Sequence, residues 1–302
     1  MKSEPIDVAI VGGGPAGLSA ALWLGRYRRT AIVFDAGEPR NEPAWAVHGY
    51  PGLPDPAPLE LRRRLVQQAL GAGARIVNEE VKRVGGAKNE FTVSSAGGET
   101  RARRLVLAYG LRDYLPEIDG VAELYGTSVF HCGDCDGPAV ADTRIGVLGW
   151  NRHGANMALY LRHFSENVVL LTHGRGDELS EQAQSTLRSA GVEAFHAKVR
   201  RVGGHGGNLT QAELEDGKAI RLDALFFHLG SEPRCEIGEQ LGCALDADGY
   251  ITVDRGQETS IPGIHAAGDI TGQPHLAAIA AAEGVRAALA IHRSLLPEWR
   301  QV

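Results

Sequence analysis

Residues 9–24 read AIVGGGPAGLSAALWL, and residues 146–161 read GVLGWNRHGANMALYL; the two stretches align without a gap. Three turn positions correspond: Gly12 with Gly149, Gly14 with Asn151, and Gly17 with Gly154. An apolar run, glycines spaced G-x-G-x-x-G and a second apolar run are typical of a strand, a tight turn and a helix that hold a dinucleotide. We therefore expect two dinucleotide-binding domains that arose by duplication.

The correspondence continues beyond these stretches. Residues 81–86, VKRVGG, match residues 199–204, VRRVGG. Short strand-like segments follow each match and end at residues 105–110 and at residues 225–230. The predicted fold class is α/β, with two Rossmann-like dinucleotide-binding domains, each a three-layer ββα arrangement.

The carboxyl-terminal part of the chain does not continue the second domain. Residues 249–269 contain two strand-like runs, and residues 276–296 have an alanine-rich helical pattern. If this tail returns to the first domain, the second domain is an insertion within it. The expected first domain is then residues 1–115 and 246–302, and the second is residues 116–245.

Composition and charge limit the class of protein. The 302 residues are 43% hydrophobic and 23% charged, with a formal net charge of −6, as in a globular enzyme. The net negative charge argues against nucleic acid as a partner, and we interpret Arg62–Arg64 as a solvated helix face. Glycines interrupt the apolar run at residues 8–24 and acids precede it, so it is neither a membrane span nor a secretory leader. We expect a cytoplasmic protein.

The first turn has the features of a dinucleotide site. Gly12 allows the tight turn, Gly14 lets a pyrophosphate approach the backbone, and Gly17 lets helix and strand pack closely. The helix that starts at Pro15-Ala16 presents free N–H groups to the phosphates. Asp35 ends the next apolar strand, where a carboxylate accepts hydrogen bonds from ribose hydroxyls.

A thiol pair, Cys132-Gly-Asp-Cys135-Asp136, precedes the second copy. It indicates redox chemistry, because two intervening residues let the sulfurs close a small disulfide ring; the alternative is a buried pair that never reacts. We predict that the pair opens a helix whose N-terminus favours the thiolate, and that Asp136 donates and accepts protons. His131 either lowers a thiol pKa or is a structural histidine. No second C-x-x-C or H-x-x-x-H occurs, so we expect no metal site, and we interpret Cys235 and Cys243 as inert apolar residues.

Several motifs in order resemble the low-molecular-weight thioredoxin reductases, flavoproteins with two dinucleotide-binding domains. The motifs run along nearly the whole chain: Gly12–Gly17, residues 50–52 before the helix at Pro58, Cys132–Gly137, and residues 261–269. The resemblance implies that the first domain holds FAD. It also implies that Cys135 faces the flavin, that Cys132 attacks the partner disulfide, and that the protein is a homodimer.

The same resemblance assigns further residues to the cofactor. Asp269, after Gly268, would bind the ribityl chain, Val81 and Ala108-Tyr109-Gly110 would lie along the FAD, and His275-Leu276-Ala277 would lie near the flavin ring. The family usually has Ala-Thr-Gly in place of residues 108–110 and Arg-Gln in place of residues 275–276. FAD binding tolerates such changes, whereas the flavin potential depends on charge near the ring.

The second turn departs from the pattern. Asn151 fills the space through which a pyrophosphate approaches, Trp150 stands where a glycine is usual, and Thr172 takes the place of the ribose-binding acid. Family members that use NADPH carry a His-Arg-Arg cluster here, and this chain offers only His173 and Arg175. We predict that NADPH no longer binds productively. The alternative is a degraded but working NADPH site.

The predicted function is that of an FAD-dependent thiol–disulfide oxidoreductase, which passes electrons between flavin, the Cys132–Cys135 pair and an external disulfide or dithiol. The expected partner is thioredoxin, a thioredoxin-like protein or a small dithiol. The expected electron route is ferredoxin, a second flavin in the Gly149–Gly154 pocket, or oxygen. Three alternatives stay open: an NADPH-dependent thioredoxin-disulfide reductase, a dithiol oxidase that uses O2, and a non-enzymatic flavin redox sensor. Residues 112–120 and 130–132 also resemble the dithiol-oxidase-like branch of the superfamily.

Overall fold

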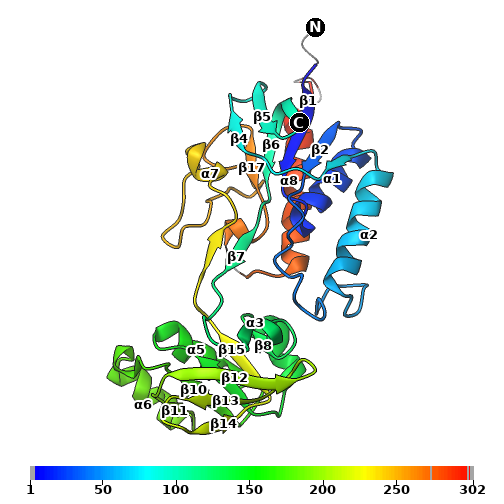
Figure 1. The fold of residues 1–302 in the computed structure, drawn as a ribbon. Coiled ribbons are helices and arrows are strands. Elements are labelled where there is room, and N and C mark those ends of the chain that lie inside the picture. The colour runs from blue at the N-terminus through cyan, green and yellow to red at the C-terminus, as the bar shows by residue number, and fades with distance from the viewer. Residues whose placement is uncertain (1–3, 273, 298, 300–302) are drawn as a thin grey trace. The chain divides into compact units, whose positions relative to one another are not determined.

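The computed structural model describes residues 4–272, 274–297 and 299, and the chain forms two compact units (Figure 1). The first unit comprises the chain up to Glu42, Gly49–Arg112, and the chain from Glu232 onward. The second unit comprises Pro43–His48 and Asp113–Ser231. The second unit is therefore inserted into the first, and a short loop from the amino-terminal part of the chain also belongs to it.

A parallel sheet forms the centre of the first unit. Its strands are β1 (Ile6–Val11), β2 (Ala31–Phe34), β3 (Arg75–Val77), β6 (Gly98–Leu107) and β17 (Ile264–Ala266). They lie in the order β3-β2-β1-β6, with β17 paired to the carboxyl-terminal end of β6. The amino-terminal end of β6 pairs antiparallel with β5 (Phe91–Ser95), and β5 pairs with β4 (Arg83–Gly85). β2 is apolar and buried throughout, as expected for a strand of a sheet covered on both faces.

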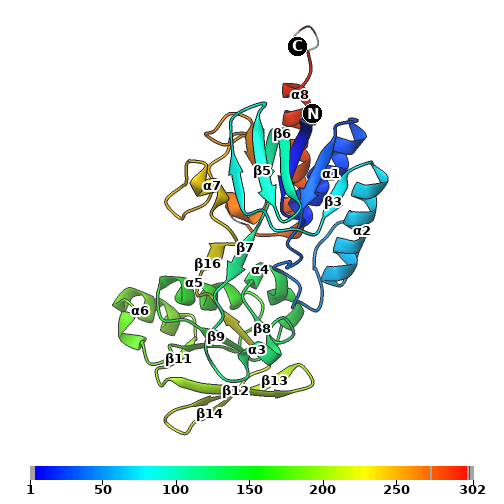
Figure 2. The same cartoon turned by 45° about the horizontal axis from the view of Figure 1, so that its top comes forward.

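Three helices pack beside this sheet, and both views show them on the same side (Figures 1 and 2). They are α1 (Pro15–Arg26), α2 (Pro58–Gly71) and α8 (Ala277–Ser294), and α1 contacts both of the others. The backbones of α1 and α8 approach closely because residue 284 is glycine. A Cβ at Gly284 would lie 2.0 Å from the carbonyl oxygen of Ala16. The remaining helix of the unit, α7 (Ile237–Gln240), is short.

The second unit has its own parallel sheet. Its strands are β8 (Val129–Phe130), β9 (Ile145–Leu148), β10 (Val168–Leu171), β11 (Glu193–Phe195) and β15 (Ala224–Phe227). They lie in the order β11-β10-β9-β15-β8. A separate antiparallel sheet joins β12 (Val199–His205), β13 (Asn208–Leu214) and β14 (Ala219–Arg221). The helices are α3 (Val121–Leu124), α4 (Gly133–Asp136), α5 (Arg152–Leu161) and α6 (Glu181–Ser189).

The two units repeat one topology. The order β11-β10-β9-β15-β8 corresponds strand by strand to β3-β2-β1-β6-β17, and each glycine turn follows the central strand of its sheet. The antiparallel strands β12–β14 correspond to β4, β5 and the first part of β6. The fold class predicted from the sequence, an α/β protein with two Rossmann-like domains, is confirmed.

The chain passes between the units at β7 (Leu111–Asp113) and β16 (Ser231–Pro233), which pair with each other. The first passage is close to the boundary expected at residue 115. The second lies well before the boundary expected at residue 245, because residues 232–245 pack into the first unit. Ile237 is only 3% exposed and belongs to the core of that unit.

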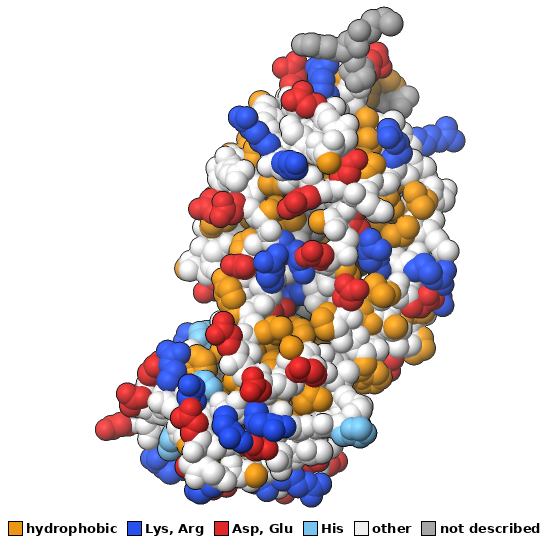
Figure 3. Space-filling model, in the orientation of Figure 1, with side chains coloured by type: hydrophobic (Ala, Val, Ile, Leu, Met, Phe, Trp, Pro, Cys, Tyr) orange, Lys and Arg blue, Asp and Glu red, His pale blue; other side chains and the backbone are white. Residues whose placement is uncertain are grey.

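The carboxyl-terminal part of the chain contains two of the three elements expected there, β17 and α8. The run at residues 249–254 forms isolated bridges, such as Leu245 with Ile251, instead of the expected strand, whereas the helix expected at residues 276–296 is α8. In the described part of the chain, no helix is both long and apolar enough to cross a bilayer. Basic and acidic side chains are interspersed on the face drawn in Figure 3.

Replacing Gly284 by alanine should destabilise the protein by about 1–3 kcal/mol, because a Cβ 2.0 Å from the Ala16 oxygen pushes α8 away from α1. Urea denaturation measures the loss as a lower midpoint. Gly71→Ala is the matched control, since no described atom lies within 4 Å of a Cβ there and alanine should be neutral or stabilising. Equal losses in the two variants would contradict the packing argument.

Candidate active site

The first glycine turn follows β1 at the carboxyl-terminal edge of the sheet. Gly12 has φ +111°, and a Cβ on it would lie 2.2 Å from the carbonyl oxygen of Ala108, which follows β6. A Cβ on Gly17 would lie 2.0 Å from the carbonyl oxygen of Gly12. Both positions therefore require glycine for the close approach of backbone segments, as the sequence predicts.

Gly14 leaves room for a ligand. In the described part of the chain, no atom lies within 4 Å of a Cβ built on this residue. Gly14 is the N-cap of α1, and no described side chain caps that end of the helix. The first amide groups of α1 are thus available to an anion, and the surroundings of Gly14-Pro15-Ala16 fit a pyrophosphate.

Asp35 lies beside this turn, at the end of β2, and is 6% exposed. A Cβ on Gly13 would lie 2.2 Å from its carboxylate, so the acid lies directly against the glycine turn. The carboxylate accepts a hydrogen bond from the Gly37 amide at 2.9 Å and forms an ion pair with Arg62 of α2. Our interpretation of Arg62 as part of a solvated helix face is therefore wrong, although Arg63 and Arg64 do lie at the surface, beside Glu60.

Asp269 follows Gly268, shortly after β17 ends at Ala266. Its carboxylate forms an ion pair with Arg40 at 2.7 Å, and the Gly268 amide donates to Glu283 of α8 at 2.7 Å. Arg40 and Glu283 carried no motif that identified them from the sequence. The structure thus brings Asp35, Asp269 and the first glycine turn to the same edge of one sheet, at the ends of β2, β17 and β1.

The other residues expected at the cofactor lie at this edge or in the core below it. Ala108-Tyr109-Gly110 follows β6, but the Tyr109 side chain packs into the core near Gly238, and burial raises the pKa of its phenol. Val81 is 7% exposed and belongs to the same core. Leu276 is the N-cap of α8, which begins at Ala277, and the ring of His275 lies 5.6 Å from that of Tyr250.

The second glycine turn differs at one position that matters for binding. Asn151 is the N-cap of α5, and its side-chain oxygen accepts hydrogen bonds from the amides of His153 at 2.9 Å and Gly154 at 3.2 Å. The helix N-terminus therefore satisfies its own donors with a side chain of the protein. The close packing of the turn persists, because a Cβ on Gly149 would lie 2.6 Å from the Cα of Gly154.

His173 and Arg175, the basic residues considered above for a nucleotide phosphate, are also engaged within the protein. The Val199 amide donates to Nδ1 of His173 at 3.1 Å, and burial lowers the pKa of this histidine. The Arg175 guanidinium stacks 4.2 Å from the Trp150 ring centroid and donates to Glu178 at 2.5 and 2.9 Å. The Arg175 guanidinium is thus paired with a carboxylate of the same chain at the surface.

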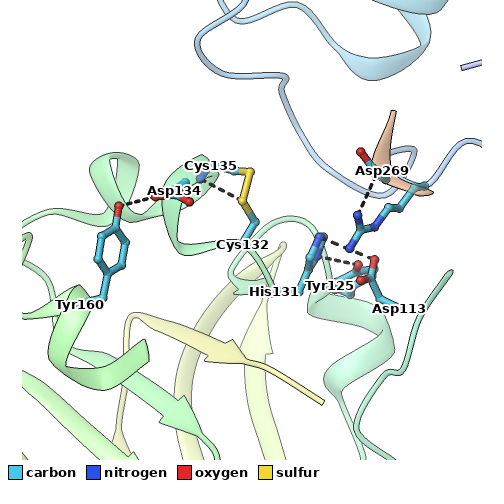
Figure 4. Close-up of a disulfide and its surroundings, with 9 residues drawn as sticks. Asp113, Tyr125, His131, Cys132, Asp134, Cys135, Tyr160 and Asp269 are labelled. Atoms are coloured by element: carbon cyan, nitrogen blue, oxygen red, sulfur yellow. Dashed lines mark hydrogen bonds and ion pairs between the residues drawn. A yellow bond between two sulfur atoms is a disulfide. The ribbon is translucent and has the colours of Figure 1, made fainter. Parts of the chain in front are cut away.

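The thiol pair forms a disulfide in the second unit, with the Cα atoms of Cys132 and Cys135 5.3 Å apart (Figure 4). Cys132 is the N-cap of α4, and the Cys135 amide donates to its sulfur at 3.1 Å. α4 is short: it ends at Asp136, and a 3-10 turn, Gly137–Val140, follows because Pro138 interrupts the hydrogen-bond ladder. The contribution of a helix N-terminus to thiolate stability is correspondingly small.

Asp136 is the residue beside the thiol pair whose pKa is strongly shifted. It is 8% exposed, and burial raises the pKa of its carboxyl to about 6, against a smaller opposing effect of His48. A carboxyl that retains its proton up to about pH 6 is suited to proton transfer near neutral pH. This fits the acid–base role expected from the sequence.

The loop Pro43–His48 brings His48 to this site and was not identified from the sequence. The Trp45 amide donates to the Gly126 carbonyl at 3.0 Å, and a Cβ on Gly126 would lie 2.0 Å from the carbonyl oxygen of Pro43. The rings of Trp45 and His48 lie 4.7 Å apart. A glycine turn that lies against another backbone segment leaves no periodic pattern, so this contact could not be predicted from the sequence.

The remaining cysteines behave as small apolar residues. Cys243 is buried in the core of the first unit, Cys235 packs against that core, and burial raises the pKa of both thiols. Within the described residues, no group of three or more histidine, cysteine or acidic side chains could hold a metal ion.

Comparison with known proteins identifies relatives over nearly the whole chain. Residues 6–284 match the family described as pyridine nucleotide-disulphide oxidoreductase. The chain is 33% identical over 279 residues to "Thioredoxin reductase tcpT" of Claviceps purpurea, covering 88% of this chain and 87% of that protein. It is 29% identical over 284 residues to the thioredoxin reductase of Bacillus subtilis, covering 89% and 88%.

Solved structures show the same similarity. The crystal structure of HlmI superimposes with a TM-score of 0.91 at 35% identity, covering 96% of this chain and 92% of that chain. The putative thioredoxin reductase TrxB of Bacillus anthracis superimposes with a TM-score of 0.89 at 29% identity, covering 96% and 98%.

The raised pKa of Asp136 predicts a pH-dependent contribution to stability. Because the folded pKa is about 6 and the ordinary value is 3.8, the folded state holds this proton more tightly, and the contribution is lost as pH rises through about 6. The unfolding free energy of the wild type, relative to Asp136→Asn, should fall by up to about 3 kcal/mol between pH 4 and pH 7. Urea titrations at several pH values measure it, and a constant difference would refute the assignment.

Proposed function

The chain belongs to the pyridine nucleotide-disulphide oxidoreductase family, and from this premise we propose that its electrons come from a donor other than NADPH and pass through Cys132 and Cys135 to an external disulfide. It is a flavin-dependent disulfide oxidoreductase of the thioredoxin reductase type. The observation that carries the proposal about the donor is the hydrogen bonding of Asn151 at the second turn.

FAD binds to the first unit in this proposal. The amides at the start of α1 would receive the pyrophosphate, Asp35 would accept from the adenosine ribose, and Asp269 would accept from the ribityl hydroxyls. Residues 108–110 would contribute backbone groups, since the Tyr109 side chain lies in the core. His275-Leu276-Ala277, at the start of α8, would lie near the ring. The bound flavin supplies two-electron transfer between its donor and the thiol pair.

The reduced thiol pair then performs disulfide exchange. The Cys132 thiolate attacks a partner disulfide, a mixed disulfide forms, and the first partner sulfur leaves as a thiolate. The Cys135 thiolate attacks Cys132 in turn, which restores the internal disulfide and releases the second partner thiolate. Asp136 supplies a proton to one leaving thiolate and solvent supplies a proton to the other, and Asp136 regains its proton when the internal disulfide is next reduced. Each cycle transfers two electrons and two protons to the partner.

The second turn disfavours NADPH for a physical reason. Binding of a pyrophosphate there would displace the Asn151 side chain from the His153 and Gly154 amides, and binding of a 2′-phosphate would compete with Glu178 for Arg175. In the first turn the equivalent amides have no such competitor, because Gly14 has no side chain. Ferredoxin would supply electrons without these losses, whereas a second flavin held near Gly149–Gly154 would avoid only the competition for Arg175, because its phosphate also needs the two amides.

The partner proposed is thioredoxin or a thioredoxin-like protein, since curated relatives carry the name thioredoxin reductase. The protein acts as a homodimer in this proposal, as the family resemblance implies.

A dithiol oxidase is the second candidate, and the capped second turn favours it equally. In this direction an external dithiol is oxidised to its disulfide, two electrons pass through the Cys132–Cys135 pair to flavin, and O2 accepts them with two protons to form H2O2. Peroxide formed in proportion to an added dithiol, with no reduction of thioredoxin, would identify this function in place of the first.

Asn151→Gly should strengthen NADPH binding about tenfold, because two amides recovered for a phosphate are equivalent to at least about 1.4 kcal/mol. Anaerobic mixing with NADPH, followed by flavin absorbance, measures this as faster bleaching in the variant than in the slowly reacting wild type. Asn151→Ser is the matched control, because serine also caps the helix and should leave binding weak. Complete bleaching of the wild type at low micromolar NADPH would refute the proposed donor.

Cys132→Ser and Cys135→Ser should each reduce turnover with a thioredoxin or dithiothreitol by at least about a thousandfold, because neither variant can form the internal disulfide. Cys235→Ser should remain close to wild type, since this thiol lies against the core. Flavin absorbance per chain, measured on the same preparations, should be unchanged. Turnover that survives in either active-site variant would favour a flavin sensor over a thiol enzyme.

A further inference from the structure

Beside the thiol pair, His131 lies between a phenol and a carboxylate (Figure 4). The Tyr125 hydroxyl lies 2.9 Å from Nδ1 of His131, and Oδ2 of Asp113 lies 3.6 Å from Nε2. The three residues come from separate elements, because Asp113 ends β7, Tyr125 follows α3 and His131 follows β8. The Asp113 side chain is 8% exposed and that of His131 is 29% exposed.

This arrangement suits a protonated ring. A carboxylate beside Nε2 favours the positive form of an imidazole. The Tyr125 oxygen accepts a hydrogen bond from a protonated Nδ1 and donates one to an unprotonated Nδ1, so the ring keeps its orientation in either state. Phe227 of β15 packs near the ring, with centroids 6.4 Å apart, and adds no charge.

The two thiols have different electrostatic neighbours. Cys132 adjoins His131, and its sulfur accepts a hydrogen bond from the Cys135 amide at 3.1 Å. Cys135 lies between Asp134 and Asp136 in the chain. A nearby cation and an amide donor favour a thiolate, whereas nearby carboxylates oppose it.

The other groups that face the pair act in both directions. The Tyr160 hydroxyl donates to Asp134 at 2.5 Å, and His48 faces Asp136 from the loop Pro43–His48. These groups temper the two carboxylates beside Cys135. His131 directly precedes Cys132 in the chain, so an imidazolium there favours a thiolate at Cys132 more than at Cys135.

We propose that Asp113 and Tyr125 are positioning residues that hold His131 as an imidazolium beside Cys132, and thereby make Cys132 the more acidic thiol of the reduced pair. This rests on the proposed function only in taking the pair as the reactive group. The imidazolium keeps its proton, and the proton that Cys132 loses passes to solvent. The residue that attacks a partner disulfide is then set by charge as well as by access.

The pH dependence of Cys132 alkylation by iodoacetamide tests this without donor or partner. The reduced Cys135→Ser protein provides a single thiol at the site, and peptide mass mapping separates Cys132 from Cys235 and Cys243. His131→Gln and Asp113→Asn, each added to this background, should raise the midpoint of alkylation by about one pH unit. Tyr125→Phe should raise it less.

The direction of the shift separates this role from a general effect of charge. Removing a carboxylate near a thiol by itself lowers the midpoint, as expected for the control Asp134→Asn, so a rise in Asp113→Asn has to come through the imidazole. In a His131→Gln background, Asp113→Asn should give no further rise. An unchanged or lowered midpoint in Asp113→Asn, in protein with wild-type circular dichroism, overturns the proposal.

Tyr125→Phe keeps the aromatic volume, so it provides the test if Asp113→Asn disturbs folding; an unchanged midpoint in Tyr125→Phe and in His131→Gln also overturns the proposal. A raised midpoint in protein that turns over no disulfide or dithiol would support the inference while refuting the proposed function.

Discussion

The two units differ most in whether the first amide groups of the helix after the glycine turn are free to bind a ligand. The N-cap of α1 is Gly14, which has no side chain, so the first amides of that helix remain available to an anion. The N-cap of α5 is Asn151, whose side-chain oxygen already accepts from two of the equivalent amides. A helix end binds phosphate only through donors that are still free, so one position in a duplicated turn decides whether the first amides are free or capped by the protein's own side chain.

The carboxylates proposed to act in the two units have different surroundings, and these surroundings suit them to different roles. Asp35 and Asp269 each lie beside an arginine, at the sheet edge where hydroxyl groups of a dinucleotide would accept and donate. Asp136 is buried next to a disulfide, with His48 as its neighbour, and its pKa is raised to about 6. In the proposed function the same side chain would therefore serve binding in one unit and proton transfer in the other, because burial and charge partners differ.

Periodic patterns and glycine turns made most of the fold predictable from the sequence. Close backbone contacts require glycine at Gly12, Gly17 and Gly149, so the two turns and the duplication were recognisable from residue type and spacing. The thiol pair was recognisable from the spacing of its two cysteines. The pairing of Asp113 with His131 was not, because it joins segments that share no repeat. The second passage between the units also differs from the boundary expected at residue 245, because residues 232–245 mix charged and apolar side chains and only their packing shows which core the apolar ones complete.

The loop Pro43–His48 has a consequence for how such a protein can be cut or recombined. Ala46 and Val47 are 6% and 8% exposed, and Trp45 hydrogen-bonds to the Gly126 turn, so these residues are an integral part of the inserted unit. A continuous fragment excised at β7 and β16 would lack them and leave the Gly126 turn bare. Grafting this module onto another scaffold therefore requires two separate splices, and gene exchange during evolution faces the same demand.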